Sequence, residues 1–443
     1  MHYPALAVLF GGGVPRLRAV GGPQRITRQG SPLKRKFGPA YLLTLVNILG
    51  FSLMLPVLPF VVERYGGSDA MYGFLLSAYA AFQFVGAPWL GRLSDSVGRK
   101  PVLMISHTGT LLSWVIFGAA WFLPDVSIWF MSVPLLVIAV SRVLDGITGG
   151  NGAVTQAYVS DLATREEKGW VFGTIGGIVG LGMMIGPAAG GFLASTPIGY
   201  LGVAIAGGAL SAFTLVSMFT SLRETLPPEA RKPSEPQPLA DSVRLIRRIV
   251  RLDPSPVIKR LFLLRAIYSA MMASYISTIA LFVIDVFHFD ERELGAYMLM
   301  VGVFIAFNQA VLAKMFVRKI GEWATLRLGL LCSALGLFTI TLTDVLWLYI
   351  VFYYVLNLGI SLTIPNFMGL TAQHARDEQM GEVMGIANGI ISLSNAVFPI
   401  MAATVYGLIG TGFYHVLTVL PLAALFLARR TQAPTPSEGE PAA

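Results

Sequence analysis

Long runs of apolar residues, separated by short polar segments, fill the chain from about residue 39 to residue 428. A helix that crosses the hydrocarbon core of a bilayer needs about 20 mostly apolar residues. The runs are unbroken rather than alternating, so they predict helices, which satisfy their own backbone hydrogen bonds in lipid, and not the strands of a barrel. The prediction is an all-α membrane protein with twelve transmembrane helices. Their predicted limits are 39–62, 71–91, 101–123, 133–160, 170–195, 200–221, 259–285, 293–314, 325–343, 346–371, 381–407 and 412–428.

A proline-rich, charged segment at 222–257 divides these helices into two sets of six. Within it, residues 241–251 place apolar side chains on one helical face and arginines on the others, which fits a helix lying on the membrane surface. A solvated linker explains this stretch equally well. The predicted parts are a basic disordered N-terminal tail (1–36), an N-terminal six-helix half (37–221), a cytoplasmic linker (222–257), a C-terminal six-helix half (258–428) and a C-terminal tail (429–443).

The composition excludes several classes of protein. Hydrophobic residues make up 55% of the 443 residues and charged residues only 13%, whereas an average soluble domain has about 25% charged residues. A soluble multidomain enzyme, a disordered chain and a disulfide scaffold are therefore excluded. The one cysteine, Cys332, lies in an apolar run and cannot form an internal disulfide.

The basic residues fall almost entirely on one side of the predicted membrane. With both termini in the cytoplasm, the tails, the cytoplasmic loops and the adjoining helix ends hold 28 of the 32 Lys and Arg residues, while Arg64 and Arg292 lie on the other side. This positive-inside asymmetry predicts a multi-pass protein of the cytoplasmic membrane with both ends in the cytoplasm. The net charge of +8 therefore orients the chain in a lipid bilayer, and no nucleic-acid partner is predicted.

The loop between the second and third predicted helices combines two glycines, a carboxylate and a basic pair. The residues are Gly91, Asp95, Gly98, Arg99 and Lys100. The glycines allow a tight reversal, and Asp95 can accept hydrogen bonds from a helix N-terminus or pair with a basic residue. Such contacts can stabilise one conformation and release another, so we predict a gating loop. The alternative is an ordinary cytoplasmic turn.

A row of glycines with one proline runs along the fifth predicted helix. Glycines four positions apart share a helix face and permit close packing of helices. The proline removes a backbone donor and bends the helix. Helix packing alone explains any one glycine pair, but not the whole spacing. The row consists of Gly173, Gly182, Gly186, Pro187, Gly190 and Gly191.

The fourth predicted helix contains two ionisable residues, Arg142 and Asp145, three positions apart and therefore on one side of the helix. An ionised residue at the centre of a bilayer costs about 2.5–3.5 kcal/mol on insertion scales, and such residues usually line a pathway. We predict that this pair couples transport to protons, with Asp145 protonated in one state and paired with Arg142 in the other. A structural ion pair that neutralises itself is the alternative.

In these motifs the chain resembles the major facilitator superfamily, whose signature in this loop reads G-x-L-x-D-r-x-G-R-K. Ser96 stands where a basic residue is usual, and residues 314–322 form a degraded copy in the second half, as expected for a fold with two pseudo-symmetric halves. The glycine row of the fifth helix resembles the antiporter signature of proton-coupled exporters in the superfamily. Arg142 and Gly146 match a fourth-helix motif associated with proton transfer.

The first helix resembles that of the tetracycline/proton antiporters, in which an Asp stands at the position of Asn47. Asn cannot titrate, so the resemblance implies that the proton site has moved to Asp145 or been lost. It also implies a central cavity lined by helices one, four, seven and ten. Interhelical hydrogen bonds and core packing explain the polar and aromatic residues of these helices as well. The predicted substrate contacts are Asn47, Asn151, Tyr275 and Asn357.

These observations predict a transporter rather than an enzyme. We expect it to export a small amphipathic compound or drug in exchange for protons, by alternating access, and to act as a monomer. No cofactor and no metal site is predicted, because the sequence has neither metal-ligand spacing nor a phosphate-binding glycine loop. The alternatives are a metabolite importer or facilitator of the same fold and a non-transporting membrane sensor.

Overall fold

The computed structural model describes residues 32–128, 131–164, 166–231, 252, 254–376 and 379–429. The chain divides after residue 36, and the structure below is that of the unit that begins at residue 37. The surface helix suggested for residues 241–251 lies outside the described residues, as do nearly all residues of the two predicted tails.

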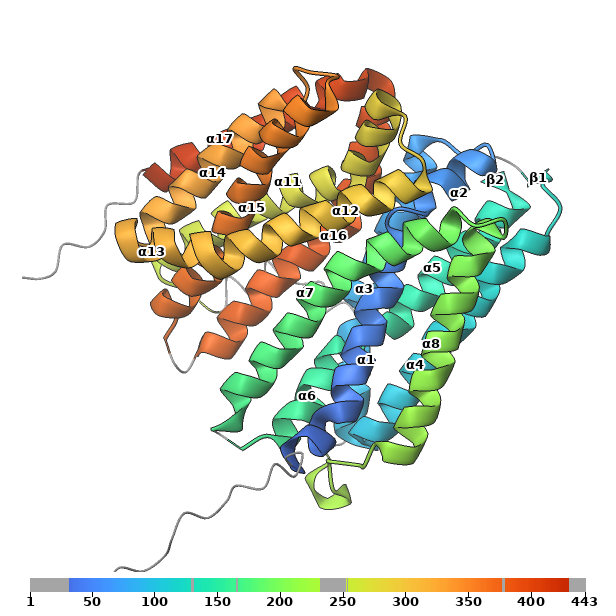
Figure 1. Cartoon of the computed structure of the whole chain (residues 1–443). Helices are drawn as coiled ribbons and strands as arrows, with labels where there is room; N and C mark the ends of the chain where they lie inside the picture. The colour runs from blue at the N-terminus through green and yellow to red at the C-terminus, as the bar shows by residue number, and fades with distance from the viewer. Residues whose placement is uncertain are drawn as a thin grey trace, which may run out of the picture. The chain divides into compact units, whose positions relative to one another are not determined.

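The first half of the described chain consists of long helices with short connections (Figure 1). The strands β1 and β2 form a small antiparallel pair that hydropathy did not predict. In order, the elements are α1 (Pro32–Met54), α2 (Leu58–Arg64), α3 (Asp69–Val97), α4 (Arg99–Ala119), η1 (Ala120–Phe122), β1 (Ser127–Ile128), β2 (Met131–Ser132), α5 (Val133–Gly149), α6 (Gly152–Leu162), α7 (Glu167–Ala194) and α8 (Gly199–Ser221).

The second half repeats this pattern of long helices (Figure 1). Between the halves lies η2 (Pro228–Ala230). The elements of the second half are α11 (Pro256–Phe287), α12 (Glu291–Phe307), η3 (Asn308–Ala313), α13 (Lys314–Ile320), α14 (Glu322–Thr339), α15 (Leu346–His374), α16 (Met380–Ile409), η5 (Gly410–Gly412) and α17 (Phe413–Arg429).

Ten stretches of the described residues are long and apolar enough to cross a membrane. The last of them, Met380–Arg429, contains two helices, α16 and α17, and the 18-residue helix α14 lies outside the ten. Together they account for the twelve predicted helices. Large apolar side chains such as Phe192, Phe213 and Phe219 are 59–69% exposed, which suits a surface covered by lipid rather than water.

Three of the predicted spans are interrupted. The span predicted at 133–160 is two helices, because the chain breaks between α5 and α6 at Gly150, where a Cβ atom would lie 2.6 Å from the backbone nitrogen of Ala87 on α3. The first span ends at Met54, and α2 follows it as a separate short helix. The eighth changes from α-helix to a π-helical segment, η3, before α13.

The two halves share one backbone turn. Gly98 precedes α4 with φ 117° and ψ 157°, and Gly321 precedes α14 with φ 79° and ψ 168°. Only glycine adopts such angles without strain. The degraded motif copy at 314–322 therefore keeps the turn, although Arg318 stands where Asp95 stands in the first half.

The halves contact each other through α3 with α16 and through α7 with α12. Close approaches occur at glycines: a Cβ atom on Gly73 would lie 2.6 Å from the carbonyl oxygen of Pro399, and one on Gly295 would lie 2.9 Å from that of Pro187. Both glycines are in the first turns of their helices, so these contacts lie toward the end of the helices away from the 91–100 loop. We call the two ends the loop end and the opposite end.

Candidate functional site

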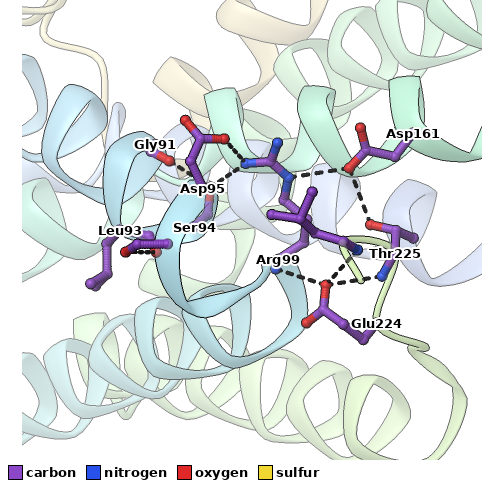
Figure 2. A network of polar contacts seen from close by, with 10 residues as sticks. Gly91, Leu93, Ser94, Asp95, Arg99, Asp161, Glu224 and Thr225 are labelled. Carbon is purple, nitrogen blue, oxygen red and sulfur yellow. Dashed lines mark hydrogen bonds and ion pairs between the residues drawn. The ribbon is translucent and has the colours of Figure 1, made fainter. Parts of the chain in front are cut away.

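Arg99 is the centre of a polar network at the loop end (Figure 2). Its Nη1 donates to Oδ1 of Asp95 and to Oγ of Ser94, both at 2.6 Å, and its Nε donates to Oδ2 of Asp161 at 3.2 Å. These contacts join the end of α3, the start of α4 and the end of α6. Arg99 is only 8% exposed, so two carboxylates compensate a largely buried cation.

Glu224, which belongs to none of the sequence motifs, completes this network (Figure 2). Its Oε1 accepts a hydrogen bond from the backbone nitrogen of Arg99 at 2.9 Å, and its Oε2 accepts one from that of Lys100 at 3.1 Å. The first N–H groups of a helix have no intrahelical acceptor, and negative charge is favoured beside them. Of its two expected roles, Asp95 therefore has the second, pairing with a basic residue. The hydrogen bonds from the helix N-terminus are accepted instead by Glu224, which lies in the segment after α8.

The other motif residues of this loop differ in their surroundings. Gly98 has φ +117°, which favours glycine, and a Cβ atom there would lie 2.5 Å from Oε2 at the end of the Glu224 side chain. A Cβ atom on Gly91 would have nothing within 4 Å. The Nζ of Lys100 donates to the carbonyl oxygen of Phe219 at 3.3 Å and ties α4 to α8. All of these contacts lie within the first half of the chain and the start of the linker, residues 222–257, that follows it.

Replacing Glu224 should destabilise the protein. Glu224→Ala removes the acceptor of two N–H groups at the start of α4, and we expect a loss of about 0.5–2 kcal/mol in the free energy of unfolding, the range for loss of a helix cap. Unfolding of the purified protein in detergent measures it. Glu229→Ala, an exposed carboxylate in η2, is the matched control. Equal effects of the two substitutions would contradict the role assigned to Glu224.

Three glycines of the row on α7 pack against α1. A Cβ atom on Gly186 would lie 2.8 Å from Cβ of Ser52, and one on Gly190 would lie 2.9 Å from the carbonyl carbon of Leu53. Gly182 faces α1 as well, and its carbonyl oxygen accepts a hydrogen bond of 3.0 Å from the Ser52 hydroxyl. The glycines thus allow the backbones of α1 and α7 to approach.

The remaining glycines of the row have different surroundings. A Cβ atom on Gly191 would lie 2.9 Å from Cα of Gly295 on α12, so this position faces the other half of the chain. Pro187 lies inside the unbroken helix α7, and its carbonyl oxygen approaches the same Gly295. The expectation of close packing is wrong for Gly173, where a Cβ atom would have no neighbour within 4 Å.

Arg142 and Asp145 form an ion pair inside α5. Nη1 of Arg142 lies 3.4 Å from Oδ2 of Asp145, and the two side chains are only 5% and 8% exposed. The guanidinium group packs near the rings of Trp114 and Phe117 on α4, with its Cζ 5.8 and 5.6 Å from their centroids. Its Nη2 is buried and has no hydrogen-bond partner among the described residues. The pair is therefore long, buried and incompletely satisfied.

Asn47 and Asn151 meet across the first half. Nδ2 of Asn47 on α1 donates to Oδ1 of Asn151 at 2.6 Å, and Nδ2 of Asn151 donates to Oγ of Ser106 on α4 at 2.8 Å. Asn151 is fully buried at the break between α5 and α6. The break places its side chain between α1 and α4. This geometry matches the interhelical hydrogen bond that was the alternative to substrate contact.

A double-mutant cycle tests this asparagine pair. Asn47→Ala and Asn151→Ala should show a coupling energy of about 0.6–1.7 kcal/mol in the free energy of unfolding, the range measured for interhelical hydrogen bonds in membranes. The pair Asn47→Ala and Asn366→Ala is the control, because Asn366 bonds within its own helix, to the carbonyl oxygen of Leu362. Strictly additive effects of the Asn47 and Asn151 substitutions would contradict the contact.

The two candidates of the second half are also buried against protein. The hydroxyl groups of Tyr275 on α11 and Tyr353 on α15 lie 2.6 Å apart. Asn357 on α15 accepts from Nδ2 of Asn308 at 3.1 Å, and Asn308 is the first residue of the π-helical segment η3. Such segments are frequent at functional sites. In this conformation Tyr275 and Asn357 are 5% and 0% exposed, so a substrate would reach them only after side chains move.

The described residues contain no group of three or more His, Cys, Asp or Glu side chains that could hold a metal ion. His107 on α4 is fully buried, and its Nε2 lies 3.1 Å from the carbonyl oxygen of Ser211 on α8.

The chain is similar in sequence to membrane transport proteins. It is 27% identical over 374 residues to the class H tetracycline resistance protein of Pasteurella multocida, covering 82% of this chain and 87% of that one. It is 26% identical over 448 residues to the major facilitator superfamily domain-containing protein 10 of Bos taurus, covering 91% and 93%. Among solved structures, the human organic anion transporter MFSD10 superposes with a TM-score of 0.66 at 24% identity, covering 90% of this chain and 100% of that one.

A sequence profile of the family matches residues 40–399, which includes all of the motifs described above. The twelve helices in two halves, the turn after α3 and its copy after α13 agree with this match. The chain belongs to the Major Facilitator Superfamily and is a membrane transporter of that fold.

Proposed function

We propose that this transporter exports a small amphipathic compound of the tetracycline type across the cytoplasmic membrane in exchange for protons. The observation that carries the proposal is the Arg142–Asp145 pair. It is buried in a membrane helix, its one ion-pair distance is 3.4 Å, and Nη2 of Arg142 is left without a partner. Asp145 can therefore change between a protonated form and an ion pair with Arg142 at a low cost in free energy, because the polar groups of the pair are not all hydrogen-bonded in either form.

Alternating access supplies the coupling. When the halves separate at the loop end, Asp145 releases its proton and pairs with Arg142, and when they separate at the opposite end it takes up a proton again. Alternating access requires the halves to close at the loop end in one state and at the opposite end in the other. The glycine contacts of α3 with α16 and of α7 with α12 form the closure at the opposite end. The 91–100 network holds the first half together at the loop end and acts as the gating loop.

The orientation follows from charge. The basic residues concentrate at the loop end, so we place that end, the linker 222–257 and both termini in the cytoplasm. The central cavity is lined by α1, α5 with α6, α11 and α15. Asn47, Asn151, Tyr275 and Asn357 lie on these elements, and we propose that they contact the substrate as it passes, in a protein that acts as a monomer.

Proton flux can drive such export. One proton that crosses about 100 mV yields roughly 2.3 kcal/mol, and each unit of pH difference adds about 1.4 kcal/mol. At about 1.4 kcal/mol per decade, one proton per substrate sustains a concentration ratio of about a few hundredfold.

Inside-out proteoliposomes with an acidic lumen test the proposal. We expect uptake of a labelled tetracycline that rises with the imposed proton gradient and collapses when an ionophore dissipates it. Uptake that is independent of the gradient would indicate a facilitator. Absence of uptake of every amphipathic compound in a panel, by protein that is folded, would contradict the proposal.

Transport of an organic anion is the second candidate. Each half contains a buried guanidinium nitrogen without a hydrogen-bond partner among the described residues: Nη2 of Arg142 on α5 and Nε of Arg265 on α11. Buried unpaired N–H groups of arginine favour an anionic partner. A fluorescent organic anion added to the same proteoliposomes distinguishes the two candidates, since Arg265→Gln should slow its uptake and leave that of a tetracycline unchanged.

A further inference from the structure

A cavity of about 440 Å³ lies at the opposite end of the molecule. It is formed by α2, the end of η1, the connection between α7 and α8, and the first residue of α12. All but one of its lining residues belong to the first half. They are Val57, Phe60, Val61, Arg64, Trp121, Ala194, Ser195, Thr196, Pro197, Gly199, Tyr200 and Glu291.

The cavity contains one cation and one anion, Arg64 and Glu291. Neither side chain has an ion pair or a hydrogen bond to another of the residues that the structure describes. Arg64 is one of only two basic residues at this end, so the asymmetry that orients the protein does not explain it. The cation instead lies over the ring of Trp121, with its Cζ 4.4 Å from the centroid.

The aromatic wall of this cavity is fixed by packing. The ring centroid of Trp121 lies 5.0 Å from that of Tyr200, whose hydroxyl group lies 2.6 Å from that of Tyr65. Tyr200 is 3% exposed. Gly199, with φ +52°, leaves room for the indole, since a Cβ atom there would lie 3.1 Å from Cζ3 of Trp121. Arg64 is thus presented on a rigid surface rather than on a mobile loop.

From this arrangement we infer that the cavity binds a zwitterion, whose phosphate or carboxylate group pairs with Arg64 and whose ammonium group pairs with Glu291. An arginine held over an indole keeps its N–H groups free for an oxyanion. A carboxylate without a partner accepts an ammonium group. The headgroup of phosphatidylethanolamine and small soluble zwitterions share this chemistry.

The position of Glu291 gives the site a second property. Glu291 begins α12 in the second half, whereas Arg64 and the aromatic wall belong to the first. Next to it, a Cβ atom on Gly191 would overlap the carbonyl oxygen of Glu291, so α7 and α12 are in close contact here. A zwitterion between the two charges therefore contacts both halves and stabilises their closure at this end.

Binding to purified, delipidated protein in detergent tests the site. Native mass spectrometry with dioleoyl-phosphatidylethanolamine and dioleoyl-phosphatidylglycerol gives the dissociation constants of two lipids, only one of which is zwitterionic. We expect the ethanolamine lipid to bind at least about 10-fold more tightly, and Glu291→Gln to remove that preference. Arg64→Gln should weaken both lipids by about 10-fold or more, as for loss of a charge-assisted hydrogen bond.

Two matched variants control for charge at this end of the molecule. Arg292→Gln and Glu63→Gln each remove one exposed charge close to the cavity, and neither residue lines it, so both should bind as the wild type does. Soluble glycerophosphoethanolamine, measured in parallel, identifies the source: binding of it points to a soluble ligand, and binding of the lipid alone points to the membrane. Equal affinity for the two lipids without binding of glycerophosphoethanolamine, or wild-type binding by Arg64→Gln and Glu291→Gln, would overturn the inference.

Discussion

Asp145→Asn should reduce the energised accumulation of substrate from about a few hundredfold to about onefold. The wild-type value is the ratio that one proton sustains across about 100 mV and one pH unit. The amide has nearly the shape of the carboxylate but cannot carry a proton between states. Arg142 then lies beside a neutral group in every conformation, so the gradient has no site on which to act. Accumulation in inside-out proteoliposomes with an imposed proton gradient measures this effect.

A separate measurement distinguishes loss of coupling from loss of folding. Exchange of labelled for unlabelled substrate without a gradient requires movement of the halves but no net proton transfer, so Asp145→Asn should retain it. Asp344→Asn, an exposed carboxylate between α14 and α15, should behave as the wild type in both assays. Full accumulation by Asp145→Asn would show that the proton site lies elsewhere.

Gly186→Leu should destabilise the protein by about 3 kcal/mol or more and abolish transport. Even a Cβ atom at this position would overlap the hydroxyl group of Ser52, so a larger side chain must push α1 and α7 apart. Overpacking of a close contact costs about 1–3 kcal/mol, and occasionally more. Since α1 also lines the proposed central cavity, its displacement would disrupt transport as well. The free energy of unfolding in detergent and substrate exchange measure the two effects.

Gly173→Leu is the matched control for that substitution. It makes the same chemical change on the same helix at a position where nothing lies within 4 Å of a Cβ atom. Leucine has a higher helix propensity than glycine by up to about 1 kcal/mol, so this variant should be as stable as the wild type or slightly more so. Similar losses in both variants would mean that the glycines act through helix flexibility rather than through packing.

The sequence predicted the number and order of the helices well. A membrane span is specified by its own composition, because each apolar run of sufficient length is stable in lipid whatever its neighbours are. Positive φ at Gly98 and Gly321 likewise follows from residue type in a short turn between two helices.

The contacts that join distant segments could not be predicted in this way. Glu224 lies 125 positions from Arg99, and its only sequence signal was a charge directly after the sixth predicted span. The break at Gly150 depends on the close approach of α3, which local hydropathy does not record. A Cβ atom on Gly173 would have no neighbour within 4 Å, although Val171, two positions earlier on α7, is buried in a cluster with residues of α1.

Asn47 shows the same limit at the candidate site. Its position in the first span suggested either a substrate contact or an interhelical hydrogen bond, and residue type alone could not distinguish the two. The structure places Asn151 2.6 Å away, which requires the break between α5 and α6 that the sequence did not indicate. The sequence shows which polar residues lie in the spans, but their hydrogen-bond partners depend on how the helices pack.

The most direct test of the account is the movement of protons out of inside-out proteoliposomes when substrate is added. The lumen is made acidic and contains a pH-sensitive dye, and a tetracycline is added outside. We expect lumenal pH to rise on addition of substrate with the wild-type protein and not to change with Asp145→Asn. Uptake of the compound by the wild type with no change in lumenal pH would contradict proton-coupled export.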